Sequence, residues 1–129
     1  MNTKCNEQRI LSLLFIMFLF FIMSSCETKE GVKINNIGQT DSVSVRVCNS
    51  KQNAKVIKDC AAINKIIDLL ENHTHRELCE FWIRKRVTFY INGQKEDIGV
   101  LGNHIKYNGE YVCDENLEMI LNEYTCDIN

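Results

Sequence analysis

Hydrophobic and polar positions follow one another along this 129-residue chain with spacings that change several times. The chain opens with a polar segment and then an apolar run, Ile10–Met23, which only Ser12 interrupts. From Val43 onward apolar and polar residues alternate, which is typical of a strand with one buried face. A helical spacing follows, then a second and longer alternation, then another helical spacing. These changes predict a short apolar segment followed by a mixed domain of strands and helices.

The first unit of the domain is predicted to be a strand followed by a helix. Val43, Val45 and Val47 alternate with polar residues and predict the strand. The polar stretch 49–58 predicts a loop, and Asp59 is placed to accept a hydrogen bond from the first turn of the helix. The helix has apolar residues at positions i, i+3, i+4 and i+7, namely Ile63, Ile66, Ile67 and Leu70.

A long alternation from Cys79 to Ile91 predicts the next strand. Lys85 interrupts its apolar face, so either a bulge or the true start of the strand lies there. Asn92-Gly93 then favours a two-residue hairpin turn, because both residues of such a turn need positive φ. With this turn, Val87 pairs with Ile98 of the returning strand.

Two further turn signals complete the sheet. Gly102-Asn103 makes the next turn, and Asn108-Gly109 repeats the hairpin signal between two short strands. Asp114 is predicted to cap a final helix over residues 115–124. The expected order is β-α-β-β-β-β-α. This is the α+β class, a single small two-layer domain with an antiparallel sheet and two helices on one face.

The N-terminal apolar run leads into a motif that resembles the lipobox of bacterial lipoproteins. The run has 14 residues, whereas a membrane-spanning helix needs ~20 and the apolar part of an export signal roughly 7 to 15. Met23-Ser24-Ser25-Cys26 follows the lipobox pattern, with Met23 where Leu is usual. The resemblance implies a lipoprotein signal peptide over 1–25 and a lipid on Cys26. The alternatives are an ordinary secretory signal and a retained membrane helix.

Residues 26–40 are polar and contain two glycines, so we expect a flexible tether between the lipid and a domain over 41–129. The formal net charge of −2 argues against nucleic acid as a partner. The chain has no proline and uses Asn, Lys and Ile heavily, in which it is similar to small Bacteroidetes-type lipoproteins. That resemblance implies a location in the bacterial cell envelope, with a membrane bound through Cys26, on its periplasmic or surface side.

The sheet face opposite the helices is the expected contact surface. Four residues on one side of the long alternation are the candidate partner-binding residues: Trp82, Arg84, Arg86 and Tyr90. Tryptophan, tyrosine and arginine are enriched at protein interfaces and at their energetic centres. The alternative is a solvated sheet face whose aromatic side chains cover the neighbouring strands.

The segment after the first helix contains a second candidate site. His73 and His75 form a His-x-His pair that puts both imidazoles on one side of an extended segment, and Cys79 adds a thiolate. These three residues predict a metal site, although Arg76 opposes a cation. The alternative is a polar surface loop between helix and strand.

Five cysteines remain when Cys5 of the signal and Cys26 are set aside. Disulfides persist outside the cytoplasm, and an odd number of cysteines leaves at least one free thiol. The expected topology brings Cys79 and Cys113 to the same end of the sheet, so they are the candidate disulfide pair. A second pair is open among the remaining three: Cys48, Cys60 and Cys126. The alternative is that several are buried and reduced.

No catalytic, phosphate-binding or cofactor motif stands out in the sequence. We therefore expect a non-catalytic lipoprotein that binds a protein or another envelope component and needs no cofactor. Immunity proteins and periplasmic enzyme inhibitors are small lipoproteins of this size, so an inhibitor is the subclass that analogy suggests. The main alternative is a metal-binding or metal-sensing lipoprotein that uses the two histidines and Cys79. An enzyme is the third option, with His104 acting beside Asp97 or Glu110.

Overall fold

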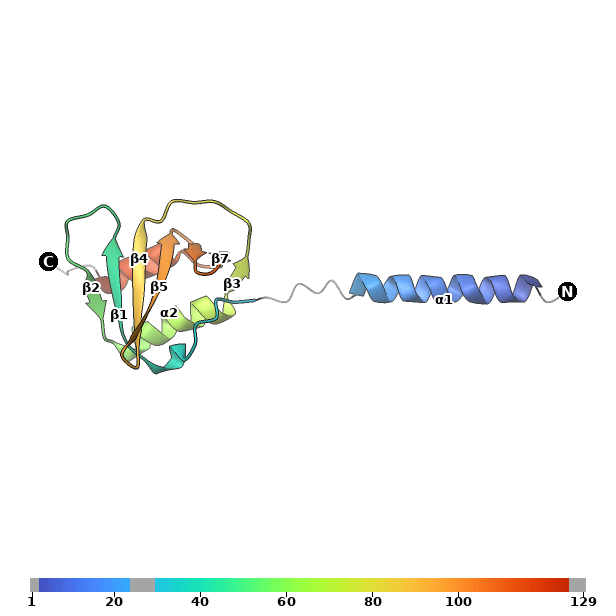
Figure 1. Ribbon diagram of the computed structural model, residues 1–129, viewed down its shortest axis with the longest axis horizontal. Helices are drawn as coiled ribbons and strands as arrows, with labels where there is room; N and C mark the ends of the chain where they lie inside the picture. Colours follow the sequence, from blue (N-terminus) through green and yellow to red (C-terminus); the bar gives the residue numbers. More distant parts are fainter. Residues whose placement is uncertain (1–2, 24–29, 126–129) are drawn as a thin grey trace.

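The computed structural model describes residues 3–23 and 30–125 (Figure 1). The N-terminal helix α1 comprises Thr3–Met23. No helix in the described residues combines the length and the hydropathy that crossing a membrane requires. Cys26, the predicted lipidation site, lies outside the described residues, as does Cys126.

Past residue 30, the described chain folds into seven strands, two α-helices and a short 3-10 helix. The strands are Thr40–Val47 (β1), Lys55–Ile57 (β2), Thr74–Arg76 (β3), Lys85–Ile91 (β4), Gln94–Leu101 (β5), His104–Lys106 (β6) and Glu110–Cys113 (β7). The helices are Ile37–Gln39 (the 3-10 helix, η1), Cys60–Asn72 (α2) and Leu117–Thr125 (α3).

The strands form one antiparallel sheet in the order β2-β1-β4-β5-β6-β7-β3, and α2 and α3 cover one face of it (Figure 1). The predicted α+β class with a single small domain is confirmed. The edge strands β2 and β3 were not predicted. Each has three residues, which is too short a segment to show an alternation, and each is defined by its partner strand.

One hydrophobic core lies between the sheet and the two helices. The four apolar residues predicted to face inward from α2 are all buried. Its N-terminus is capped as predicted, since the Asp59 carboxylate accepts a hydrogen bond from the Ala62 amide at 3.1 Å. The central strands contribute the following buried residues: Val43, Val45, Val87, Phe89, Ile91, Ile98 and Val100.

The β4–β5 hairpin has the predicted turn and the predicted register. Asn92 and Gly93 have φ values of 51° and 79°, so both lie in the left-handed region that a two-residue turn needs. Val87 pairs with Ile98, as predicted. This register puts the apolar residues of both strands on the face that the helices cover.

The strand predicted from Cys79 begins only at Lys85. Of the two options that the interrupted alternation left open, the true start of the strand is therefore the one observed. Residues 77–84 form no strand. We call them the crossing loop, because they run from the end of β3, at one edge of the sheet, across to the start of β4 in its middle (Figure 1).

Two side chains of the crossing loop pack on the open face. Ile83 fills the space above Gly99 of β5, where a Cβ atom would lie only 2.5 Å from Ile83 Cδ1. The Phe81 ring packs on the His104 ring of β6, with 5.3 Å between the ring centroids. Two of the apolar residues that suggested a strand are therefore partly buried on the outer face of the sheet.

The segment before β1 belongs to the domain. Val32, Ile34 and Ile37 are buried in the core, and the Val32 amide donates a hydrogen bond to the Leu70 carbonyl oxygen at 2.8 Å. The prediction of a flexible tether over 26–40 is therefore wrong from Val32 onward. Three apolar residues spaced among polar ones suffice to dock this segment against the end of α2.

Helix α3 begins later than predicted. Its first residue is Leu117, and the Asn116 Oδ1 atom accepts a hydrogen bond from the Met119 amide at 3.2 Å. Asn116 therefore caps the N-terminus of α3, the role that we predicted for Asp114. The Asp114 carboxylate instead faces the histidines at the start of β3, as described below.

Candidate functional site

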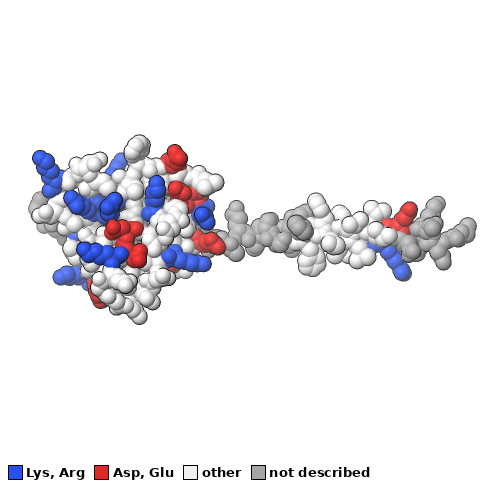
Figure 2. Space-filling model, viewed as in Figure 1, with Lys and Arg blue, Asp and Glu red and all other residues white. Residues whose placement is uncertain are grey.

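The open face of the sheet carries a groove beside the crossing loop, with a volume of about 740 Å³. The residues that line it come from the turn after β1, from the crossing loop and from β6 and β7: Cys48, Asn49, Glu80, Phe81, Trp82, Ile83, Lys106 and Glu110. We call it the sheet-face groove. Figure 2 shows lysine and arginine side chains interspersed with acidic ones on the visible side of the domain.

Backbone hydrogen bonds hold both ends of the crossing loop. At its start the Glu77 amide donates to the Glu110 carbonyl oxygen at 3.1 Å. At its end the Arg84 amide donates to the Val100 carbonyl oxygen at 3.0 Å, and the Arg84 carbonyl accepts from the Cys48 amide at 2.8 Å. Together with the two side chains seated on the sheet, these contacts fix the loop as one wall of the groove.

The crossing loop leaves two large apolar side chains in solvent. Trp82 is 92% exposed and Leu78 is 94% exposed. Trp82 lines the sheet-face groove. From the sequence, its position was predicted only as the outer face of a strand. Because the backbone on either side of it is held, Trp82 is presented at a defined position.

The other predicted partner-binding residues do not join Trp82 in one patch. The Arg84 guanidinium lies 3.6 Å from the Glu118 carboxylate of α3, so this side chain is directed to the helix layer. The Tyr90 ring lies beneath Lys95 Nζ, which is 5.5 Å from the ring centroid. Of the four predicted residues, Trp82 lines the groove and Arg86 lies next to it.

A second, smaller pocket of about 320 Å³ adjoins the sheet-face groove. Its lining is Arg46, Val47, Cys48, Asn49, Ser50 and Arg86, so it shares Cys48 and Asn49 with the groove. Arg46 and Arg86 stand directly opposite each other in the β1–β4 ladder. The open face therefore combines an aromatic groove with a pair of neighbouring guanidinium groups.

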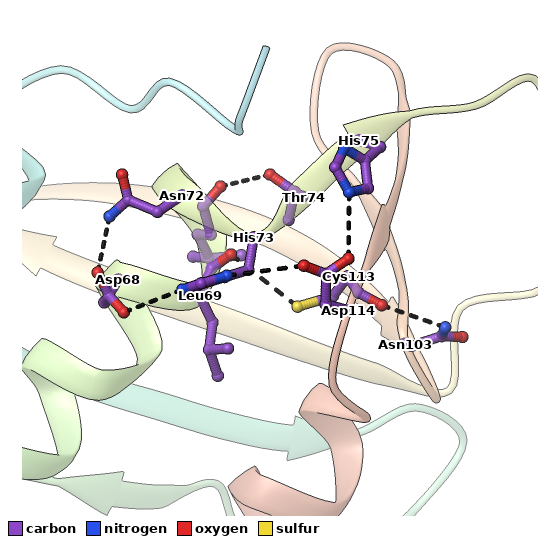
Figure 3. Close-up of polar contacts among 10 residues, drawn as sticks. Asp68, Leu69, Asn72, His73, Thr74, His75, Asn103, Cys113 and Asp114 are labelled. Atoms are coloured by element: carbon purple, nitrogen blue, oxygen red, sulfur yellow. Dashed lines mark hydrogen bonds and ion pairs between the residues drawn. The ribbon is translucent and has the colours of Figure 1, made fainter. Parts of the chain in front are cut away.

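The predicted metal site is not formed. His73 and His75 both face Asp114, with nitrogen–oxygen distances of 3.6 Å and 3.1 Å, and His73 also lies 3.5 Å from the Asp68 carboxylate (Figure 3). The Cys79 thiol contacts the Glu80 carbonyl instead. Within the described residues, no three His, Cys, Asp or Glu side chains are placed to hold a metal ion. The histidines serve as polar contacts between α2, β3 and β7.

The predicted Cys79–Cys113 disulfide is not formed in the described part of the chain. Within the described residues 30–125, the cysteines at positions 48, 60, 79 and 113 are free thiols. Cys113 is buried, and its Sγ atom lies 3.9 Å from the Leu69 carbonyl oxygen (Figure 3). Burial raises the pKa of the Cys113 thiol above its ordinary value of 9.0. Thr74 of edge strand β3 is the residue paired with Cys113 of β7. The strand expected beside Cys113 was instead one that begins at Cys79.

The first of the two pairs considered for an enzyme, His104 with Asp97, is not assembled. His104 packs against Phe81, and its Nδ1 atom is buried without a hydrogen-bond partner in the described structure. Asp97 accepts a hydrogen bond from the Thr88 hydroxyl at 2.5 Å. It lies four residues along β5 from Leu101, the residue opposite His104, which is roughly 13 Å along a strand. The two groups are therefore too far apart to act together.

Sequence reasoning missed most of the groove. Cys48, Asn49 and Lys106 are polar or small residues at strand ends, and no period marks them. One usable signal was Gly99, because a glycine inside a strand often marks the close approach of another segment. That segment is the crossing loop.

Comparisons of the chain with models of protein families, with curated proteins and with solved structures gave no match.

Proposed function

We propose that this chain is a non-catalytic binding module that is held in a bacterial cell envelope by a lipid on Cys26 and takes its partner in the sheet-face groove. The lipid anchor is supported by the lipobox-like sequence Met23-Ser24-Ser25-Cys26. The binding role is supported above all by one observation, the nearly full exposure of Trp82 on a loop whose ends are held.

An exposed tryptophan at a fixed position favours recognition for two reasons. Leaving a large aromatic side chain in water forgoes roughly 1.5–3 kcal/mol of burial free energy, so a folded domain gains by burying Trp82 against a partner. The ring is also pre-positioned, and less conformational entropy is lost when it binds. Tryptophan is accordingly enriched among the residues that dominate binding energy.

The partner class is a protein or another component of the envelope. The lining residues of the groove carry both charge signs, Lys106 beside Glu80 and Glu110, which suits a partner with mixed polar and apolar character. Small lipoproteins of this size include immunity proteins and periplasmic inhibitors. By that analogy alone, a protective inhibitor is the subclass that we propose.

Site-specific photocrosslinking in cells tests the binding role. A photoreactive amino acid placed at position 82 should form a defined adduct with one envelope protein. The matched control is position 119 on α3, where Met119 is 62% exposed but lies away from the groove. Adducts that form equally at both positions, or at neither, would contradict the proposed groove.

Intact mass spectrometry of the membrane-extracted protein tests the anchor. We expect a chain that starts at Cys26 and carries a lipid-sized increment of mass. The Cys26→Ala variant should lack the increment and leave the membrane fraction. A chain that starts elsewhere without lipid would rule out the anchor while leaving the groove to be judged by the crosslinks.

A further inference from the structure

We infer that Arg46 and Arg86 form an anion-binding subsite at one end of the sheet-face groove, and that its occupant is an acidic segment of a polypeptide. The inference rests on the proposed binding function and specifies the chemistry of the partner. It is carried by the position of the two guanidinium groups on the sheet and by the mixture of aromatic and charged residues that line the adjoining groove.

The two arginines are placed where the fold alone would disfavour them. They are direct partners in the β1–β4 ladder, so their Cβ atoms are about 4.5–5.5 Å apart and like charges at this position repel. Both side chains are exposed. Within the described residues neither makes an ion pair or a side-chain hydrogen bond. A bound anion between them would remove this repulsion.

The pocket around the two arginines supplies further polar groups. Asn49 and Ser50 line it from the turn after β1, and Asn49 holds a left-handed backbone conformation with φ of 63°. The guanidinium group presents planar pairs of N–H donors that match a carboxylate or phosphate group. The pocket volume of about 320 Å³ leaves room for one such group.

The residues that line the adjoining groove limit the class of ligand that can bind. Besides Cys48 and Asn49, which line both spaces, the groove is lined by the rings of Phe81 and Trp82 and by charged residues of both signs, namely Glu80, Glu110 and Lys106. The two carboxylates outnumber the single lysine, so this lining disfavours a ligand with a continuous run of negative charge, such as nucleic acid. An extended polypeptide that places an acidic residue between the arginines and an apolar residue against Trp82 satisfies both regions.

Trp82 provides the probe, because it is the single tryptophan of the chain. The full chain in detergent is titrated with a blocked hexapeptide that contains two acidic residues followed by leucines, and with its Asn/Gln counterpart. We expect the acidic peptide to shift the Trp82 emission and to bind at least about tenfold more tightly than the amide peptide. The R46Q/R86Q double variant should lose this preference. Lys95→Gln, which removes one charge beside Tyr90 on the same face, should keep it.

The other possible outcomes distinguish failure of the anion subsite, failure of the polypeptide as its occupant and failure of the proposed function. Equal binding of the two peptides, or an unchanged preference in R46Q/R86Q, would overturn the subsite. Inorganic phosphate that displaces the acidic peptide at equal concentration would overturn the polypeptide as occupant and leave an anion site. If no peptide shifts the emission while crosslinks still form at position 82, the subsite fails and the proposed function stands.

Discussion

The His75 Nε2 atom lies 3.1 Å from the Asp114 Oδ1 atom, and this contact links edge strand β3 to the residue that follows β7. The Asp114 amide adds a second link, because it donates a hydrogen bond to the His73 carbonyl oxygen at 2.9 Å. Asp114 thus holds the histidine pair to the sheet through its side chain and its backbone. A pattern that suggested metal coordination is explained by the attachment of an edge strand.

Asp114→Asn should weaken this attachment modestly. Both side chains are about half exposed, and ion pairs at such positions contribute roughly 0.2–1 kcal/mol. We expect a loss of that size in the free energy of unfolding, measured by urea denaturation. In a double-mutant cycle with His75→Gln the two losses should not add. Simple additivity would mean that the contact contributes nothing.

Gly31→Ala should destabilise the domain strongly. A Cβ at this position would lie 1.9 Å from the Glu71 carbonyl oxygen, which is backbone and cannot move aside alone. Gly38 is the matched control, because nothing lies within 4 Å of its Cβ position. We expect Gly31→Ala to lower the free energy of unfolding by about 1–3 kcal/mol or more and Gly38→Ala to leave it nearly unchanged. Equal effects would show that residue 31 is not docked on α2.

Glu118→Gln should cost far more than Arg84→Gln, although the two side chains contact each other. Glu118 accepts a hydrogen bond from the Gly102 amide at 2.8 Å and faces the buried Lys85 ammonium at 3.9 Å. Removing one partner of a buried charge pair typically costs roughly 3 kcal/mol or more, whereas the exposed Arg84 contact is worth about 1 kcal/mol or less. Thermal and urea unfolding of both variants would test this order, which equal losses would contradict.

Stability should fall at alkaline pH in part because of Cys113. Burial raises the pKa of this thiol above 9.0, so the folded state holds the proton more tightly than the unfolded state. The free energy of unfolding therefore declines as pH rises from about 9 through the folded-state pKa. Cys113→Val should lack this part of the decline above about pH 9.

The comparison with Cys113→Val must be made as a difference, because a second group acts with the same sign. Burial, and then the hydrogen bond and charge of Glu96, raise the pKa of Tyr107. Identical pH profiles for the two proteins would contradict the role of Cys113. As an independent check, an alkylating reagent should modify the exposed Cys60 quickly and Cys113 only when the domain unfolds.

Elements with their own periodicity were predictable from the sequence. The α2 pattern, its Asp59 cap and the Asn92-Gly93 hairpin depend on local residues, and each has the predicted form. The edge strands β2 and β3 were not predictable, because three residues acquire a strand conformation only through a partner distant in sequence. The fold class therefore followed from the long elements alone.

The candidate groove was predicted only in part, because it depends on the crossing loop. The loop has the same alternation as a strand, and its Phe81 and Ile83 side chains are partly buried, but on the outer face. The seat of Ile83 depends on the absence of a side chain at Gly99. The alternation of apolar residues in the crossing loop cannot show that a strand elsewhere in the sequence lacks a side chain at the point of contact. Trp82 was therefore correctly singled out as exposed, while the wall opposite it was not foreseen.

The docking of Val32 on Leu70 has a geometric consequence for the proposed anchor. Only five peptide links separate Cys26 from Gly31, the residue that meets the backbone of α2. Such a length reaches at most about 18 Å even when fully extended. A domain lipidated at Cys26 would thus have a short stand-off from the bilayer. It would meet partners that lie at the membrane surface and would miss those held deeper in the envelope.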